Sequence, residues 1–317
     1  MPSRRKAAGL LLATLTLSST WYVFKHVIQP HVVARRTFVD QVLGGTAEAP
    51  YQYRVLHPLL GHGLESALPS AFGDEWRHCA AYGLVMLVCF AGIYGFFHAW
   101  LRMLFTPATA LLGSVMLALP LPLAVTGHIV EGDFVTLLVF SLGFWLMATG
   151  REVWLPLLVG LGTLNREQTA YLIVFFAASL AARRSLGGRR EQALLAASVM
   201  AFLAVFLGVR AFYGPRPNPY GVAFNVAHNM SPRNLREAIA PLWLAEVVGP
   251  AVLAGMAFRR TTTFLRLGFL ALGPYLVLFV LNGLLIEMAK FLPAFLVLIP
   301  MALQTLTGER PRDPPEG

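Results

Sequence analysis

The sequence predicts an all-α protein, a polytopic bundle of membrane helices. Of its 317 residues, 56% are apolar and only 13% are charged, whereas soluble proteins average about 45–50% and about 25%. Long apolar runs recur along the whole chain, in place of the short alternating stretches that a membrane β-barrel shows. This pattern argues against an ordinary soluble enzyme, a disordered chain and a coiled coil.

Ten apolar segments are expected to cross the membrane. They run over residues 7–28, 79–101, 107–126, 134–149, 153–164, 169–182, 192–213, 241–258, 264–284 and 291–306. We expect one transmembrane domain over 1–306, with large outer loops at about 29–78 and 214–240. Residues 307–317 are polar and rich in proline, which predicts a disordered cytoplasmic tail.

The distribution of basic residues predicts the orientation of the chain. The basic stretch 1–6 precedes an apolar run without a small-residue cleavage site, which is typical of an uncleaved anchor with a cytoplasmic N-terminus. Arginines also gather in alternate short loops, as the positive-inside rule requires. Ten crossings then place both termini in the cytoplasm, and the expected location is the cytoplasmic (inner) membrane.

Charge and cysteine content exclude other classes of function. The net charge of +9 follows from basic loops beside apolar spans, and the basic runs are short, so we expect no nucleic-acid partner. Cys79 and Cys89 are ten residues apart, about 15 Å along a helix, which is too far for a disulfide. No cysteine-based metal site is expected.

The apolar stretch 153–182 allows two arrangements. As one helix it is about 45 Å long, which exceeds the ~30 Å hydrocarbon core. As a hairpin it places the turn Asn165–Gln168 at membrane depth, and this is the arrangement we favour. Arg166 and Glu167 then lie at a depth where charges are tolerated only in a wet cavity or as an internal pair. They are expected to bind a ligand or to form a structural ion pair with each other.

Ionisable residues from separate stretches are predicted to share the outer side of the membrane. These residues are Asp40, Arg54, His57, His62, His128, Glu131, Asp133, Arg166, Glu167, His228, Glu246, Glu287 and Lys290. The pattern predicts one polar cavity that opens outward. The alternative is that outer loops simply hold the polar residues of any membrane protein.

Three local patterns sharpen this expectation. Arg54 precedes an amphipathic helix with leucines at 56, 60, 64 and 68, where it can face a phosphate or reach lipid headgroups. The stretch 127–133 holds two acids and a histidine, which suit acid–base chemistry, a metal or an ordinary turn. Glu287 and Lys290 lie three residues apart on one helical face, as a ligand site or a surface ion pair.

Taken in order, these patterns resemble those of bacterial multi-pass proteins, mostly uncharacterised, that look like the GT-C class of glycosyltransferases. Members show YRVL-x-P after the first span, an acidic turn, NRET and E-x-R-x-F. Residues 53–58 read YRVLHP, which matches well. Residues 165–168 read NREQ, with glutamine in place of threonine, and 287–291 read EMAKF, with lysine one position later. The resemblance covers most of the chain.

The resemblance implies a helix bundle that takes a sugar from a polyprenyl-phosphate donor. Asp40, in the long first outer loop, is the implied catalytic base, and Asp133 is its competitor. Arg54, His57, Arg166 and Lys290 are the expected cations for the phosphate. The remaining candidates for substrate binding are Tyr53, His128, Glu131, Asn165, Glu167 and Glu287.

A non-enzymatic membrane protein is the alternative. It would be a carrier or flippase for lipid-linked glycans, or an assembly subunit. A carrier is expected to hold charges that can be reached from both sides of the membrane, whereas the predicted cytoplasmic halves are nearly free of them. A divalent metal is possible but not indicated by any specific pattern. The expected partners are membrane lipids and the lipid-linked donor, and the sequence makes no prediction of oligomeric state.

Overall fold

Helices make up most of the chain in the computed structural model, which describes residues 4–71, 73–125, 130–238, 244–285 and 287–312. No strand occurs within these residues. The α-helices are α1 Arg4–Val23, α2 Val32–Leu43, α3 Leu56–Ala67, α4 Asp74–Leu104, α5 Pro107–Ala118, α6 Leu121–Ala124, α7 Glu131–Ala148, α8 Leu155–Asn165, α9 Ala170–Ala182, α10 Arg189–Tyr213, α11 Val222–Asn229, α12 Pro232–Ala238, α14 Gly249–Ala257, α15 Thr263–Asn282 and α16 Leu292–Thr307. Short π and 3-10 helices connect them at η1 Phe24–Ile28, η2 Tyr51–Tyr53, η3 Glu152–Trp154, η4 Glu167–Thr169, η5 Leu244–Val248 and η6 Met288–Phe291. The predicted all-α bundle is therefore confirmed.

Six helices in the described residues are long and apolar enough to cross a membrane: α1 with η1, α4, α7, α10, α15, and η6 with α16. Each of the ten predicted segments contains a helix, but four of these helices are short. α5, α8, α9 and α14 have 12, 11, 13 and 9 residues, whereas a full crossing needs about 20. Within the described residues, six of the ten predicted segments therefore contain a helix of spanning length, and the structure does not support ten spans.

The stretch 153–182 forms the predicted hairpin. α8 ends at Asn165, and Arg166 adopts an extended conformation with φ −156° and ψ 138° before the chain turns into η4 and α9. At the other end of the hairpin, Arg183 Nη1 lies 2.6 Å from Glu152 Oε1. This ion pair joins the start of the first arm to the end of the second, so the two helices run antiparallel.

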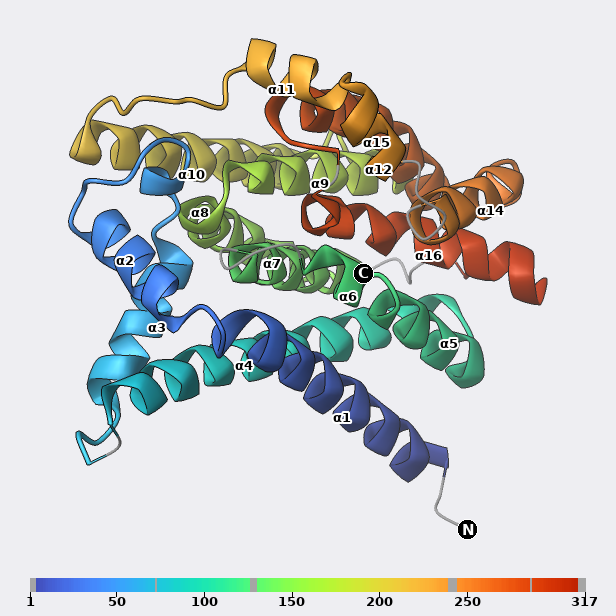
Figure 1. The fold of residues 1–317 in the computed structure, drawn as a ribbon. Helices are drawn as coiled ribbons and strands as arrows, with labels where there is room; N and C mark the ends of the chain where they lie inside the picture. Colours follow the sequence, from blue (N-terminus) through green and yellow to red (C-terminus); the bar gives the residue numbers. More distant parts are fainter. Residues whose placement is uncertain (1–3, 72, 126–129, 239–243, 286, 313–317) are drawn as a thin grey trace.

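The two ends of the bundle differ in their connections (Figure 1). The connection that includes α2, η2 and α3 lies at the end drawn on the left, where α10 also ends, and the connection that includes α11 runs from there across the top of the view. The opposite end carries the short connections and ten of the arginines. These are Arg102, Arg151, Arg183, Arg184, Arg189, Arg190, Arg259, Arg260, Arg310 and Arg312. The orientation predicted from the sequence depends on this uneven distribution of arginines between the two ends of the bundle.

Helices α16 and α10 mark the centre and the outside of the bundle. Every residue of α16 from Leu292 to Gln304 is buried, and it packs against α5, α7, α14 and α15. α10 packs against α8 and α9, but Ser198 is its only buried residue, as expected for a helix at the lipid-facing edge of the bundle. The first tail residues lie against α5, where Glu309 accepts a hydrogen bond from Thr109 Oγ1 at 2.7 Å.

The amphipathic helix α3 packs with its small and polar face toward the bundle. His57, Pro58 and Gly61 are buried, whereas Leu60 is 44% exposed. A Cβ atom on Gly61 would lie 2.1 Å from Cζ of Tyr82, so glycine is required for this close approach. Of the leucine stripe, Leu56, Leu64 and Leu68 pack against the hydrophobic core, and Leu60 is left to face outward beside Leu59, which is 49% exposed.

Candidate functional site

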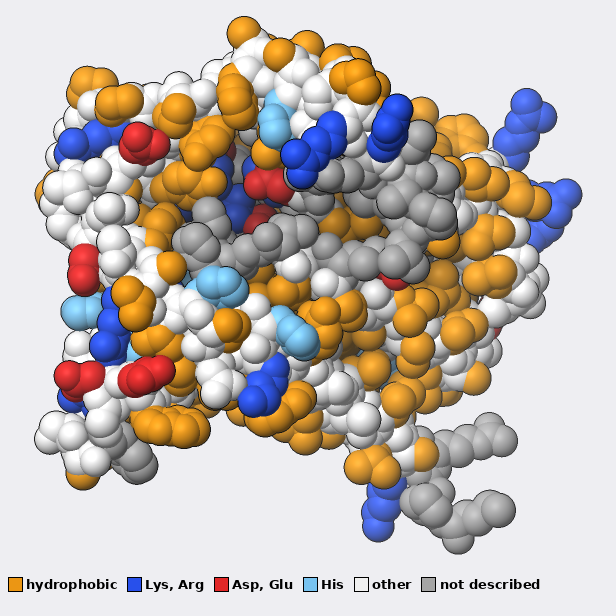
Figure 2. All heavy atoms as spheres, in the orientation of Figure 1, with side chains coloured by type: hydrophobic (Ala, Val, Ile, Leu, Met, Phe, Trp, Pro, Cys, Tyr) orange, Lys and Arg blue, Asp and Glu red, His pale blue; other side chains and the backbone are white. Residues whose placement is uncertain are grey.

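A cavity of ≈ 340 Å³ opens at the end of the bundle that carries the longer connections. It is lined by residues of η4, α9, α15 and η6, by Arg54, which follows η2, and by Arg166, which precedes η4. Its charged and amide side chains are those of Arg54, Arg166, Glu167, Gln168, Asn282 and Lys290. Ala170, Leu278 and Phe279 form an apolar wall. Figure 2 shows a hollow on this face with basic and acidic side chains at its floor.

The break between α8 and η4 places the central residues of the site. Arg166 remains anchored to α8, because its backbone N–H donates to the carbonyl of Gly162 at 2.8 Å. The side-chain amide of Asn165 donates to the carbonyl of Gly132 at 2.6 Å and to Thr136 Oγ1 at 2.9 Å. Asn165 therefore fixes the turn against the first turn of α7, which is a positioning role.

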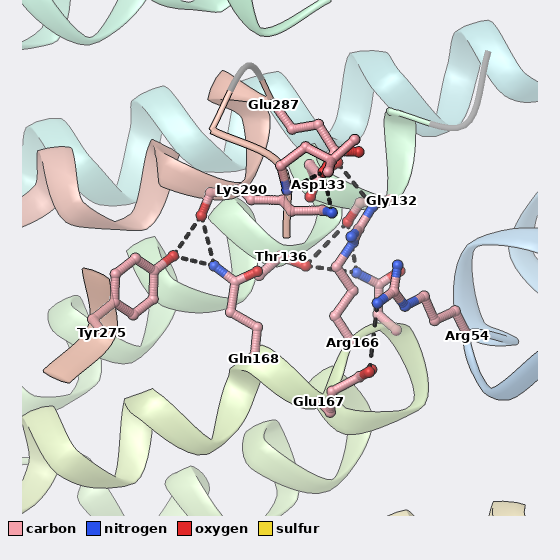
Figure 3. A network of polar contacts seen from close by, with 12 residues as sticks. Arg54, Gly132, Asp133, Thr136, Arg166, Glu167, Gln168, Tyr275, Glu287 and Lys290 are labelled. Atoms are coloured by element: carbon pink, nitrogen blue, oxygen red, sulfur yellow. Dashed lines mark hydrogen bonds and ion pairs between the residues drawn. The ribbon is translucent and has the colours of Figure 1, made fainter. Parts of the chain in front are cut away.

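Three ion pairs converge at the cavity (Figure 3). Arg166 Nη2 lies 2.8 Å from Asp133 Oδ2, and Arg54 Nη2 lies 3.4 Å from Glu167 Oε1. Lys290 pairs with Glu287. The six charged residues come from four separate stretches of the chain, as the sequence predicts for a shared cavity.

The expected pairing of Arg166 with Glu167 is wrong. Each residue pairs with a different part of the chain, Arg166 with α7 and Glu167 with the residue that follows η2. The physical reason is the extended backbone at residue 166, because consecutive side chains in extended backbone point in opposite directions.

Several buried polar atoms at the cavity have no hydrogen-bond partner within the described residues. They are Nε of Arg54, Nε of Arg166 and Oδ1 of Asp133. A buried polar group without a partner costs about 1–3 kcal/mol, so such atoms are rare unless water or a ligand contacts them. The two guanidinium groups therefore keep donor capacity that the protein itself does not use.

The charges of the cluster balance. Arg54, Arg166 and Lys290 contribute three positive charges, and the three paired carboxylates contribute three negative charges. Burial lowers the pKa of Arg54, but the carboxylates of Glu167 and Asp133 outweigh it and raise the pKa above its usual value. Arg54 therefore stays a cation even though its side chain is only 16% exposed.

Glu131 lies outside this cavity, in a second buried network. Its carboxylate accepts a hydrogen bond from Arg35 Nε at 2.8 Å, and both side chains are almost fully buried. Arg35 also donates to the carbonyls of Val27 and Ile28, each at 2.9 Å. The pair thus holds α2 against η1 and α7, and Glu131 does not line the cavity with the other candidates.

The sequence interpretation missed Arg35. The buried residues of α2 are Val32, Arg35, Val39 and Val42, which follow the i, i+3, i+7 spacing of an inward helix face. This spacing places the arginine among three valines on the buried side. An arginine on an apolar helix face is the signal that could have identified it, because such a charge needs a buried partner.

His57 is buried between the two networks. Its ring contacts Tyr82 edge-on, with the centroids 5.3 Å apart. Burial, together with the positive charges of Arg35 and Arg166, lowers the pKa of His57 to about 3. A His57 ring with this pKa is neutral at physiological pH, and His57 is not among the residues that line the cavity.

The remaining candidates lie at the edge of the site or outside it. The hydroxyl of Tyr53 donates to the carbonyl of Gly214 at 3.0 Å, and the guanidinium of Arg210 lies 4.4 Å from the centre of the Tyr53 ring. Asp40 is exposed on α2 and does not line the cavity. His128 lies outside the described residues. Within the part of the chain that the structure describes, no group of three His, Cys, Asp or Glu side chains could hold a metal ion.

No family model, curated protein or solved structure matches this chain. Its function therefore has to be inferred from the cavity and from the charged residues that line it.

Proposed function

We propose that this protein is an integral membrane glycosyltransferase. It takes a sugar from a polyprenyl-phosphate-linked donor and transfers it to an acceptor on the outer face of the cytoplasmic membrane. The observation that supports this most is the cavity itself, in which two arginines and a lysine lie beside an apolar wall. A phosphate attached to a hydrocarbon chain needs a cationic surface for the phosphate beside an apolar surface for the chain.

The cationic side of the cavity suits the phosphate of the donor. Arginine offers a planar fork that binds phosphate through two parallel hydrogen bonds, and both Arg54 and Arg166 keep a free Nε–H within the described structure. When the sugar leaves, negative charge develops on the phosphate oxygen of the donor. Preorganised cations at this position stabilise that charge.

The apolar wall suits the lipid part of the donor. Leu278 lines the cavity, yet it is also 48% exposed, and the neighbouring Val277 is 60% exposed. The wall therefore continues onto the outward face of α15. A polyprenyl chain can lie along this face while its phosphate reaches the arginines, so its hydrocarbon stays in the lipid.

Asp133 is the catalytic base in this proposal. The acceptor hydroxyl attacks the anomeric carbon of the sugar, the bond from that carbon to the phosphate oxygen breaks, and the hydroxyl proton passes to a carboxylate. Asp133 Oδ2 is held by Arg166, while its Oδ1 is buried and has no partner in the described residues. Asp133 is ion-paired with Arg166, which lines the cavity, whereas Asp40 lies exposed on α2 away from the lining residues, so we choose Asp133 of the two.

The proposed location is the inner membrane, with both termini in the cytoplasm. The arginine-rich loops at the end opposite the cavity support this orientation. A cysteine introduced at Gly187 should react with a membrane-impermeant maleimide only after the cells are opened. Labelling of this cysteine in intact cells would reverse the orientation.

We expect Asp133→Asn to reduce sugar transfer about 10²-fold or more, because general base catalysis contributes about 10²–10⁴-fold. The measurement is mass spectrometry of products formed by the purified protein in nanodiscs with polyprenyl-phosphate-linked sugars. Asp40→Asn is the matched control and should retain full activity. Full activity of Asp133→Asn contradicts the assignment of the base. If the wild type moves donors across a bilayer without cleaving them, the protein is a carrier and the enzyme proposal is wrong.

A further inference from the structure

The three ion pairs at the cavity are unequal in strength, and this difference indicates how a ligand binds. We propose that Glu167 occupies the phosphate position on Arg54 in the ligand-free protein, and that the phosphate of an isoprenoid phosphodiester displaces it. This inference rests on the proposed function. It adds an exchange in which a carboxylate of the protein holds the site until the substrate replaces it.

The pair of Arg54 and Glu167 is the one that can open. Its atoms are 3.4 Å apart, and the carboxylate side chain is 34% exposed. The pair of Arg166 and Asp133 is closer, at 2.8 Å, with both side chains exposed by 7% or less. Separating a partly exposed pair costs little, because water solvates the released carboxylate, whereas separating a buried pair is costly.

The vacated position matches a phosphate in geometry. Glu167 contacts one Nη of Arg54 and leaves the Nε of that arginine unused. A phosphate in the same place can accept from both nitrogens, which form the bidentate edge of the guanidinium. The free Nε–H of Arg166 belongs to the same cavity, so a second phosphate oxygen has a donor without any loss of the Arg166–Asp133 pair.

The charge balance favours a ligand with one negative charge. The cluster is neutral as it stands, with three cations and three carboxylates. When Glu167 turns into water, Arg54 is released, and one phosphodiester charge restores neutrality. The ligand class is therefore a singly charged phosphodiester on an isoprenoid chain.

Removal of the charge on Glu167 should strengthen ligand binding. Glu167→Gln keeps the size of the side chain but removes the competing carboxylate, so phosphate meets an uncovered Arg54. Exposed ion pairs contribute up to about 1 kcal/mol, and this value for the partly exposed Arg54–Glu167 pair corresponds to about a fivefold tighter dissociation constant. Arg54→Gln should weaken the same binding at least as much.

The test is a titration of the purified protein in phosphatidylcholine nanodiscs, read by native mass spectrometry. The probes are a farnesyl phosphodiester of methanol, dimethyl phosphate as the matching headgroup without a chain, and phosphatidylglycerol. The proteins are the wild type, Glu167→Gln, Glu167→Ser and Arg54→Gln. Glu191→Gln is the control, because Glu191 lies at the opposite end of the bundle, at the start of α10. Thermal unfolding of each variant reports whether it is folded.

The expected result is about fivefold tighter binding of the farnesyl phosphodiester to both Glu167 variants and no change in the Glu191 control. Unchanged or weaker binding in both folded Glu167 variants overturns the exchange while the proposed function stands. Absence of farnesyl phosphodiester binding in every protein overturns the proposed function as well. Equal affinity for phosphatidylglycerol assigns the pocket to membrane phospholipid, and equal affinity for dimethyl phosphate assigns it to a free phosphate diester. Either result overturns the isoprenoid assignment.

Discussion

Glu131→Leu is expected to lower the free energy of unfolding by about 3–5 kcal/mol, because removal of one partner of a buried ion pair leaves the other charge uncompensated. Arg35 is only 1% exposed, and Glu131 is its carboxylate partner. The two backbone carbonyls that Arg35 also contacts carry no net charge. They cannot replace the lost carboxylate.

The double variant Arg35→Met/Glu131→Leu provides the control. Replacement of both partners of a buried pair by apolar residues is often neutral or stabilising, so this protein should recover most of the lost stability. Chemical unfolding in detergent, followed by tryptophan fluorescence, measures all three proteins. If the single variant is as stable as the wild type, then Arg35 does not depend on Glu131, and the described role of this pair is wrong.

Arg166→Met should have the second largest effect, also about 3–5 kcal/mol, because Asp133 is then buried without its cation. The double variant Arg166→Met/Asp133→Leu should regain stability but neither bind a phosphodiester nor transfer sugar. Recovered stability without binding or transfer would show that this pair of residues is needed for function and not only for folding.

Arg166→Met/Glu167→Leu is the matched comparison, since the sequence alone suggests that these neighbours pair. It should remain as unstable as Arg166→Met, because Glu167 is the partner of Arg54. Unfolding in detergent measures both double variants side by side. Recovery of stability in the Glu167 double variant, and not in the Asp133 double variant, would contradict the pairing described here.

Much of the fold could be predicted from the sequence, because apolar runs and breaks are local signals. The hairpin over 153–182 was favoured because one helix of that length exceeds the membrane and would place the arginines at 183–190 on the outer side. The number of membrane crossings was harder to predict than the positions of the helices. The segment predicted over 107–126 is divided into α5 and α6, because a proline at position 120 interrupts the helix. Hydropathy alone does not distinguish a short helix that packs inside the bundle from one that spans the membrane.

The candidate site was predicted in outline but not in its pairing. Polar residues at helix ends on one side indicate a shared cavity, and the structure brings Arg54, Asp133, Arg166, Glu167 and Lys290 together. Which carboxylate pairs with Arg166 depends on the extended backbone at residue 166. The spacing of residues in the sequence does not predict this backbone conformation. The separation of Glu131 from Asp133 onto different networks has a similar cause, because two residues along a helix turn a side chain by about 200°.

The most direct test of the central proposal is a structure of the purified protein with a bound isoprenoid phosphodiester, determined by electron microscopy in nanodiscs. We expect the phosphate to contact Arg54 and Arg166, the isoprenoid chain to lie along Leu278 and Phe279, and Glu167 to be turned away from Arg54. The pair of Arg166 and Asp133 should remain intact, with Asp133 facing the sugar side of the phosphate. A phosphate bound elsewhere on the bundle, with all three ion pairs unchanged, would contradict the proposal that this cavity is the substrate site.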